Sequence, residues 1–400
     1  MLRHLFRRRK ATLRVLVEVG SFDKGGLEKV VLDSTLALHH AGVPTLIVSV
    51  GPLGILASAA RAAGLQVAGL PSRGAARAYA RLLRDFAPTL AVSHFSTFGY
   101  NLLARRGVPV VSFIHNVYAF MDAAQRARFA ADDRTVAHYV AVSAKAAQYA
   151  TARLGIDPAR ITVVPNGLDL EQTARRAAAA RPVDRAALGI ADGDCVFLNV
   201  ASYNLHKGHY VMAAALRLLL SHRQDIRIVC IGNVVHPPHL DGLRAYLRAH
   251  GLAAHMLLPG YAEDVAGWFA MADAFLLPSF IEGWSIAMNE AMGFARPMIL
   301  TDTGGAAEVI EDEDTGILIP NEYGEVTALD STLLDRLAYA TRDFRIAADL
   351  ARAMERIAGD RPGWAAAGLR GRAKLQARYG MSAISARHRA VLDAVAAVAR

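Results

Sequence analysis

Two glutamates, Glu282 and Glu290, stand eight positions apart in the segment 276–305, LLPSFIEGWSIAMNEAMGFARPMILTDTGG. The apolar start of this segment predicts a buried strand, and the pattern that follows predicts an amphipathic helix that begins at about Trp284 or Ser285. Because a helix rises about 1.5 Å per residue, the two carboxylates span up to roughly 12 Å. Each can accept hydrogen bonds from the paired hydroxyls of a ribose or a hexose. The spacing therefore suits one carboxylate at each end of a nucleotide sugar, although two such glutamates, taken alone, are more often solvated.

The turn between the expected strand and helix is suited to hold a diphosphate. Gly283, Trp284 and Ser285 lie there, where the first backbone N–H groups of a helix have no partner inside it. The positive end of the helix dipole lies behind these groups, so the turn favours an anion. Gly283 has no side chain and lets the backbone approach a phosphate closely.

Three further polar residues lie at the ends of predicted strands. His115 ends the run VVSFIH, and His94 and Ser96 lie at the end of the run LAVSHF. The carboxyl ends of parallel strands gather at one edge of a sheet, where ligands bind. We therefore expect His94 and Ser96 to line an acceptor pocket, which would bind the substrate that receives the sugar. A lone histidine such as His115 more often has a structural role, so its position alone does not decide between a structural role and a role in the site.

These segments belong to a regular alternation of short apolar runs and alanine-rich helical patterns. The runs from LRVLVEV to ITVVP precede a polar, alanine-rich stretch, and the alternation restarts with CVFLNVAS. The alternation predicts parallel sheets with helices on both faces, and the interruption predicts two doubly wound halves that face each other across a cleft. We expect a first domain at residues 1–172, a linker at 173–182, a second domain at 183–380, and a C-terminal helix at 381–400 that crosses back onto the first domain.

The segment 276–305 resembles the donor-site block of glycosyltransferase family 4. The likeness rests on Pro-Ser-x-x-Glu-Gly, a second Glu after seven intervening residues, Ala-Met-x-x-x-x-Pro and Thr-Gly-Gly-x-x-Glu. The resemblance implies the GT-B fold, with two Rossmann-like domains, and a retaining, metal-independent transferase similar to glycogen synthases and to glycosyltransferase group 1. It also implies that Glu290 binds the ribose, that Glu282 lies beside the donor sugar, and that backbone N–H groups of residues 283–285 meet the distal phosphate.

Other blocks are similar to the same family and cover most of the chain. SFDKGGLEKVV is similar to the glycine loop in which Gly25 and Gly26 approach the donor phosphates and the acceptor. Residues 141–170 resemble the block that closes the first domain, with Asn166 on the acceptor side. The position of His115 matches a histidine that family members place beside the donor sugar.

In the second half, NVASYNLHKGHYVMAAAL resembles the segment that carries an arginine and a lysine to the diphosphate. Lys207 matches the lysine, whereas Ser202 stands where the arginine is usual. Unless another cation replaces that arginine, the leaving diphosphate is less well neutralised. LLPGYAEDV resembles the loop beside the nucleobase, with Gly260 and Tyr261 near the ring, although Tyr261 could equally pack inside the domain. The residues expected to act in catalysis are His115, Lys207 and Glu282.

The bulk composition fits a two-domain protein with anionic partners. The chain has 400 residues, 53% of them apolar, which is enough for two full cores. Cys195 and Cys230 lie in strand-like runs and are expected to be core thiols in a reducing cytoplasm. The net charge is +9, and the basic arm at residues 1–10, with interleaved Leu and Phe, fits either an anionic membrane surface or a solvated terminus. We expect a cytoplasmic protein, on the inner face of the membrane if the arm binds it, with no membrane-spanning helix.

Two Asp-x-Asp patterns and a histidine pair raise the alternative of a metal site. Asp192 and Asp194 precede a strand, and the second pattern, at 312–314, lies in a loop, so both are typical of turns. His236 and His239 flank two prolines and lack further ligands nearby. We therefore assign no metal and no cofactor, and treat the nucleotide sugar as a substrate.

The expected reaction moves a sugar from a UDP- or GDP-linked donor to a glycan or lipid-linked acceptor, in bacterial surface-polysaccharide assembly. A sugar-nucleotide epimerase or a phosphorylase on the same fold is one alternative. A non-catalytic nucleotide- or nucleic-acid-binding protein is another, favoured by the basic charge. No Gly-x-Gly-x-x-Gly follows the first strand, and cations do not alternate with aromatics on one element, so we expect no nucleic-acid partner.

Overall fold

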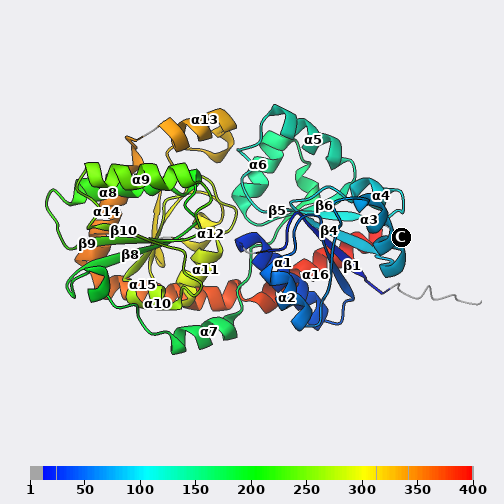
Figure 1. Cartoon of the computed structure of the whole chain (residues 1–400), viewed down its shortest axis with the longest axis horizontal. Helices are drawn as coiled ribbons and strands as arrows, with labels where there is room; N and C mark the ends of the chain where they lie inside the picture. The colour runs from blue at the N-terminus through cyan, green and yellow to red at the C-terminus, as the bar shows by residue number, and fades with distance from the viewer. Residues whose placement is uncertain (1–11, 24, 312, 341, 399–400) are drawn as a thin grey trace, which may run out of the picture.

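The computed structural model describes residues 12–23, 25–311, 313–340 and 342–398. They form two α/β domains that lie side by side, each built on one parallel sheet (Figure 1). The expected pair of doubly wound domains is thus confirmed. The basic arm at residues 1–10 lies outside the described residues.

The first domain holds a seven-stranded sheet in the order β3-β2-β1-β4-β5-β6-β7, with every neighbouring pair parallel. Strands β1, β2 and β4 are buried along their whole length, which is why their sequences are nearly continuous apolar runs. The elements are β1 (Val15–Val19), α1 (Gly26–His40), β2 (Thr45–Ser49), α2 (Ile55–Ala62), β3 (Gln66–Gly69), α3 (Ala75–Phe86), β4 (Leu90–His94), α4 (Tyr100–Ala104), β5 (Val110–Ile114), α5 (Ala123–Asp133), β6 (Val136–Ala141), α6 (Ala144–Leu154) and β7 (Ile161–Val163).

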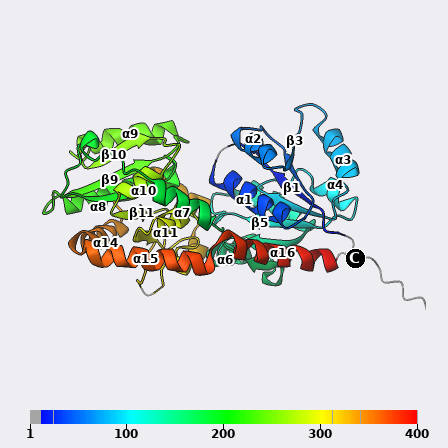
Figure 2. The same cartoon turned by 90° about the horizontal axis from the view of Figure 1, so that it is seen from below.

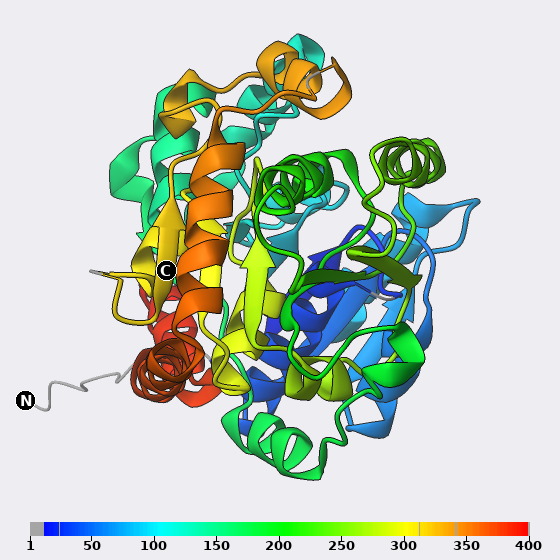
Figure 3. The ribbon, with the colours of Figure 1, turned by 90° about the vertical axis from the view of Figure 1, so that its left-hand side faces the viewer.

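The second domain holds a six-stranded parallel sheet in the order β10-β9-β8-β11-β12-β13. Helices α14 and α15 cover its β13 edge (Figure 3). The elements are β8 (Cys195–Val200), α8 (His209–Leu219), β9 (Ile226–Ile231), α9 (Pro237–Ala249), β10 (Met256–Gly260), α10 (Ala266–Met271), β11 (Ala274–Leu277), α11 (Ile286–Gly293), β12 (Met298–Thr301), α12 (Ala306–Val309), β13 (Gly316–Ile319), α13 (Ser331–Asp335), α14 (Ile346–Gly359) and α15 (Arg361–Arg378).

The strand order creates a ligand-binding position in each sheet. In the first sheet β1 lies between β2 and β4, and in the second β8 lies between β9 and β11. At such a switch point the connections leave on opposite faces, so a crevice opens beyond the carboxyl ends of the two central strands. The loops after β1, β4, β8 and β11 carry most of the residues predicted for the site.

Two helices run between the domains. Helix α7 (Leu170–Ala179) follows the first sheet and packs against α10 and α11 of the second domain. Helix α16 (Met381–Val398) continues from α15 and packs against α1 of the first domain, so that α15 and α16 together run beneath both domains (Figure 2).

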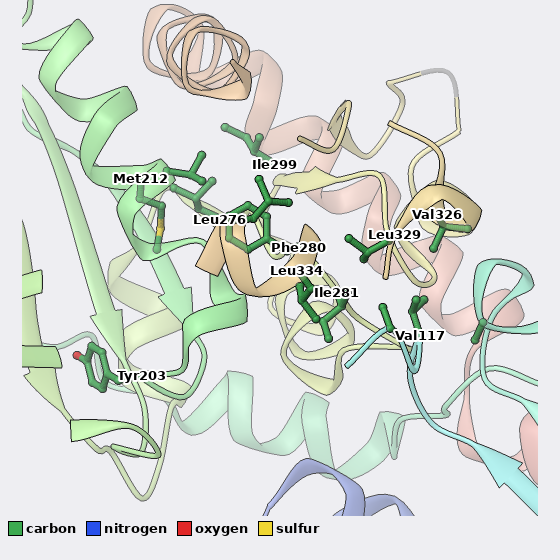
Figure 4. Close-up of a cluster of buried hydrophobic side chains, with 14 of the residues drawn as sticks. Val117, Tyr203, Met212, Leu276, Phe280, Ile281, Ile299, Val326, Leu329 and Leu334 are labelled. Atoms are coloured by element: carbon green, nitrogen blue, oxygen red, sulfur yellow. The ribbon is translucent and has the colours of Figure 1, made fainter. Parts of the chain in front are cut away.

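One hydrophobic cluster joins the two domains. It includes Val117, which follows β5, together with Ile281 and Leu334 of the second domain (Figure 4). Phe280 and Leu276 continue the cluster toward the second sheet. The two domains are therefore held in register by apolar packing next to the loop after β11.

Two carboxylates of the second domain hold the first turn of α6. The Ala144 N–H donates to Glu308 Oε1 at 2.8 Å, and Lys145 Nζ lies 3.0 Å from Asp302 Oδ2. Acidic groups are favoured at a helix start because its free N–H groups carry partial positive charge. Glu308 is the glutamate of the Thr-Gly-Gly-x-x-Glu block, so this part of the sequence pattern lies at the domain interface.

Both cysteines are free and buried, as expected for core thiols. Burial raises the pKa of the Cys195 thiol to about 12. Among the described residues, no helix is long and apolar enough to cross a membrane.

Candidate active site

A cleft of about 870 Å³ takes residues from both domains. The first domain contributes the loop after β1 and the end of β5. The second contributes the loops after β8, β10 and β11 together with α11. The predicted site residues that line it are Gly25, Gly26, His115, Asn166, Ser202, Lys207, Tyr261, Glu282, Trp284, Ser285 and Glu290. Four others, His94, Ser96, Gly260 and Gly283, lie outside its lining.

Lys207 and Glu282 meet at the switch point of the second sheet. Lys207 follows β8 in a 3-10 turn and Glu282 follows β11, and these two strands are neighbours. Lys207 Nζ lies 2.6 Å from Glu282 Oε1, and Ser279 Oγ donates to the same oxygen at 2.8 Å. The ammonium group is therefore already held in the cleft, where an anionic ligand could share it with the carboxylate.

Glu290 lies on α11 and is bound by an arginine that comes from α7. Arg176 Nη1 lies 3.1 Å from Glu290 Oε1, and Nη2 lies 2.8 Å from Asp264 Oδ1. Burial raises the pKa of Glu290, and the hydrogen bond and charge of Arg176 oppose that rise. The bond from Arg176 also lowers the pKa of Asp264. The sequence placed Arg176 only in a linker, because an arginine in a polar, alanine-rich stretch belongs to no motif.

The described residues that line the cleft include three cations, Lys29, Arg176 and Lys207. Lys29 Nζ lies 2.6 Å from both carboxylate oxygens of Asp33 on its own helix, and Arg176 is bound to Glu290. Ser202 lines the cleft without a charge of its own. All three cations are thus paired with carboxylates, and a phosphate near the start of α11 would meet Lys207, whose partner Glu282 lies in the turn before that helix, together with the backbone N–H groups.

Helix α11 begins at Ile286, slightly later than expected, and Ser285 is its N-cap. The turn before it is bound to the first domain. Asn166 Nδ2 donates to the Trp284 carbonyl at 3.1 Å, and Asn289 Nδ2 donates to the Asn166 carbonyl at 2.9 Å. Asn166, predicted for the acceptor side, thus both lines the cleft and ties the two domains together at this turn.

Gly283 lies against the backbone of the first domain. It forms an antiparallel bridge with Asn116 of the first domain. A Cβ at this position would overlap the carbonyl oxygen of His115. The missing side chain therefore makes room for the opposite domain, and the close approach of a phosphate to Gly283 stays a prediction.

Gly283→Ala is expected to destabilise the protein by about 1–3 kcal/mol, because the added methyl group must displace the His115 backbone. Urea unfolding followed by tryptophan fluorescence measures the change. Gly193→Ala is the control, since a Cβ there meets no atom within 4 Å. Equal unfolding midpoints for the two variants would show that the interface tolerates the methyl group.

His115 faces the cleft and is backed by two further histidines. Its Nε2 lies 2.7 Å from His94 Nδ1, and His388 of α16 lies close enough to affect both rings. Burial lowers the pKa of His115 to about 3 and that of His388 to about 4, so both are neutral near pH 7. His94 is buried behind His115, which corrects its expected place in the lining of an acceptor pocket.

Ser96 also lies outside the cleft. Its Oγ donates to Glu18 Oε1 at 2.6 Å, and the Gly99 N–H donates to Oε2 at 3.0 Å. Burial raises the pKa of Glu18. Ser96 lines a separate pocket of about 200 Å³ that shares Phe95 with the cleft.

Phe95 is 54% exposed at a φ of 57°, which is rare for a bulky residue. The loop after β4 therefore borders the cleft through Phe95.

Gly260 ends β10 with a φ of 94°, and its carbonyl accepts from the Gly232 N–H at 2.8 Å. This places Gly260 in the backbone of the sheet and outside the cleft lining. Tyr261 follows and is 58% exposed, and it lines the cleft together with Val235. The tyrosine therefore lies at the cleft and not in the core of its domain.

Two of the residues weighed as metal ligands have side-chain partners in the protein. Asp194 Oδ2 lies 3.1 Å from Arg227 Nη2, and His239 Nε2 lies 3.2 Å from His209 Nδ1. Asp312 lies outside the described residues. Within the described part of the chain, no group of three or more His, Cys, Asp or Glu is placed to hold a metal ion. Metal independence stays a prediction.

Family models match both domains. The model "Glycosyltransferase Family 4" matches residues 24–172, and "Glycosyl transferases group 1" matches residues 180–338. The D-inositol 3-phosphate glycosyltransferase of Arthrobacter sp. is 32% identical over 164 residues, which are 40% of this chain and 38% of that protein. The enzyme of the same name from Jonesia denitrificans is 28% identical over 254 residues, 58% of each chain. The chain thus matches only 38% to 58% of the length of these two relatives.

Solved structures agree with the fold along nearly the whole chain. Anabaena Alr3699/HepE in complex with UDP has a TM-score of 0.77 at 16% identity, covering 96% of this chain and 100% of that one. The sucrose-phosphate synthase of Thermosynechococcus elongatus has a TM-score of 0.72 at 17% identity, with the same coverage. At these identities the likeness shows the fold alone. Together with the family models on both domains, it establishes that the chain belongs to the family 4, group 1 glycosyltransferases of GT-B fold.

Proposed function

We propose that the chain is a retaining, metal-independent glycosyltransferase that moves a sugar from a nucleotide-diphosphate sugar to an acceptor hydroxyl. The observation that carries the proposal is the placement of Glu290, Lys207 and the start of α11 along one interdomain cleft. Its volume of about 870 Å³ lies in the range of small-molecule sites. Glu290 accepts from the ribose, Lys207 and the α11 N–H groups meet the diphosphate, and Glu282 lies beside the sugar.

The nucleobase end of the donor lies toward Tyr261 and Val235, which line the same cleft. UDP is the first candidate nucleotide, because Anabaena HepE was solved with UDP and with UDP plus glucose. GDP is the second. A melting-temperature screen against UDP, GDP and ADP tests this step, since a ligand that binds the folded form stabilises it by mass action.

In the reaction, the bond between the anomeric carbon and the leaving phosphate oxygen breaks while the acceptor oxygen bonds to the same face of that carbon. The acceptor proton passes to the leaving phosphate oxygen, so no protein nucleophile is required. Lys207 and the N–H groups at the start of α11 stabilise the charge that develops on the diphosphate. His115, neutral near pH 7, is suited to hydrogen-bond the donor sugar, and closure of the domains excludes water.

The acceptor approaches from the first domain, past Phe95 and the glycine loop. The relatives named D-inositol 3-phosphate glycosyltransferase support a hydroxyl-rich acceptor. We extend the proposal to a glycan or lipid-linked acceptor in bacterial surface-polysaccharide assembly, on the cytoplasmic side of the membrane. Incubation with a UDP-sugar, with and without candidate acceptors, separates the alternatives. An isomeric nucleotide sugar formed from the donor alone would identify an epimerase, and NMR of a transfer product gives its anomeric configuration.

Transferase activity is expected to be equal in EDTA and in Mg²⁺. The α11 N–H groups and Lys207 already provide positive charge for the diphosphate, which is the service a divalent ion supplies in other transferases. Initial rates with saturating donor, measured after dialysis against EDTA and after Mg²⁺ is restored, check this. A rate that disappears in EDTA and returns with Mg²⁺ would refute metal independence, but it would not contradict the rest of the proposal.

A further inference from the structure

Arg176 enters the cleft from the segment that connects the two domains. It lies on α7, which packs against α10 and α11. Its two terminal nitrogens bind different carboxylates, Glu290 of α11 and Asp264 of the loop before α10, and all three side chains line the cleft. A planar guanidinium with separate donors suits such a fork, which an ammonium cannot reproduce.

The contact engages one oxygen of Glu290 and leaves the other for a ligand. Oε1 accepts from Arg176 Nη1 at 3.1 Å. Among the described residues, Oε2 has no hydrogen-bond partner, although the side chain is only 16% exposed. A carboxylate fixed through one oxygen, with the other open to the cleft, can accept from a vicinal diol without losing its hold on the protein.

The environment of Glu290 makes this support necessary. Burial disfavours its ionised form and raises its pKa, and Arg176 provides the largest opposing effect, followed by Lys29 across the cleft. Without Arg176, the carboxylate would be protonated at a higher pH, and its rotamer would no longer be held. A protonated carboxyl accepts fewer hydrogen bonds from ribose hydroxyls.

We propose that Arg176 is a positioning residue that holds Glu290 for the 2′- and 3′-hydroxyls of the donor ribose, and so makes the cleft selective for ribonucleotides. The inference rests on the proposed function, because it assumes that Glu290 meets a ribose. It adds a residue from the domain connection to the site and assigns it a role in choosing the nucleotide.

The test compares the affinities for UDP and for 2′-deoxy-UDP by isothermal titration calorimetry on the full chain. The wild type is expected to bind UDP about tenfold more tightly than 2′-deoxy-UDP, the value of one hydrogen bond to a charged group. Arg176→Ala is expected to lower UDP affinity by more than tenfold and 2′-deoxy-UDP affinity by less, because only the 3′-hydroxyl of the latter can bind Glu290, so the ratio falls towards one. Arg176→Lys should fall between the two. Arg175→Ala is the matched control, because Arg175 is the neighbouring arginine, is exposed, and pairs with the exposed Glu171 of α7 rather than with a residue of the cleft lining.

A second readout is pH. The pKa of Glu290 is already raised, and loss of Arg176 raises it further, so Glu290 in Arg176→Ala is protonated at a higher pH than in the wild type. As the pH is lowered, UDP affinity should therefore begin to fall at a higher pH for the variant than for the wild type, while the ionisation of UDP itself is common to both proteins.

The outcomes separate the two proposals. Binding of UDP by the wild type, with equal losses of UDP and 2′-deoxy-UDP affinity in Arg176→Ala or with no loss at all, would overturn the role of Arg176 and leave the transferase standing. A wild type that binds none of UDP, GDP and ADP would overturn the proposed function itself. Melting temperatures of all variants identify any that fail to fold.

Discussion

Glu290→Ala is expected to weaken UDP binding by about 100-fold or more while the protein stays folded. The carboxylate faces the cleft with one oxygen fixed by Arg176, and its removal deletes two hydrogen bonds between a charged group and the ribose. Such bonds contribute about 1.5–3 kcal/mol each, and about 1.4 kcal/mol corresponds to a factor of ten. Arg176 keeps Asp264 as a partner, so the variant does not leave its charge unpaired. Calorimetry gives the affinity, and the melting temperature reports the fold.

Two further variants test whether the loss of UDP affinity is specific to the carboxylate of Glu290. Glu290→Gln retains the shape and one acceptor oxygen but loses the charge, so its affinity should lie between those of the wild type and Glu290→Ala. Glu171→Ala removes an exposed glutamate of α7, 88% accessible, and should bind UDP as the wild type does. Unchanged UDP affinity in Glu290→Ala would show that Glu290 does not bind the ribose, and it would contradict the proposed donor site.

Lys207→Ala is expected to lower kcat by about 10²- to 10³-fold. Ser202 brings no charge to the position where the sequence pattern leads one to expect an arginine, and Lys29 and Arg176 are bound to carboxylates. Lys207 is paired as well, with Glu282, but this pair lies in the turn before α11, so Lys207 is placed to stabilise charge that develops only as the phosphate leaves. The loss should therefore appear mainly in kcat, with a smaller change in KM for the donor. Steady-state rates over a range of donor concentrations separate the two constants.

Lys29→Ala provides the comparison for Lys207→Ala. It also removes a paired lysine from the cleft lining, but the partner of Lys29 is Asp33 on α1, whereas the partner of Lys207 lies in the turn before α11, so the effect of Lys29→Ala on kcat should be much smaller. Lys207→Arg should recover part of the rate because it restores the charge. If Lys29→Ala and Lys207→Ala lose equal activity, the charge of the leaving group is not neutralised mainly by Lys207.

The sequence by itself determined the layout of the molecule. Nearly continuous apolar runs mark strands buried on both faces, and their alternation with helical patterns requires parallel sheets. Strand ends then locate loops at one edge, which is why the positions of Glu282 and His115 in the cleft were predictable, whereas the resemblance to family 4 indicated Lys207. The turn before α11 was predictable for the same reason, since an apolar run that changes to helical periodicity marks its own boundary.

Only the tertiary structure decided which distant groups meet. Arg176 reaches Glu290 because α7 packs against α11, and no spacing within the chain encodes that contact. Gly283 meets the backbone of His115, and His94 lies behind His115, because two domains and two neighbouring strands come together there. Periodicity reports which face of an element is buried, whereas the identity of the partner depends on how whole elements pack. The ion pairs and interdomain contacts of the site are therefore properties of the fold, and the sequence alone left them open.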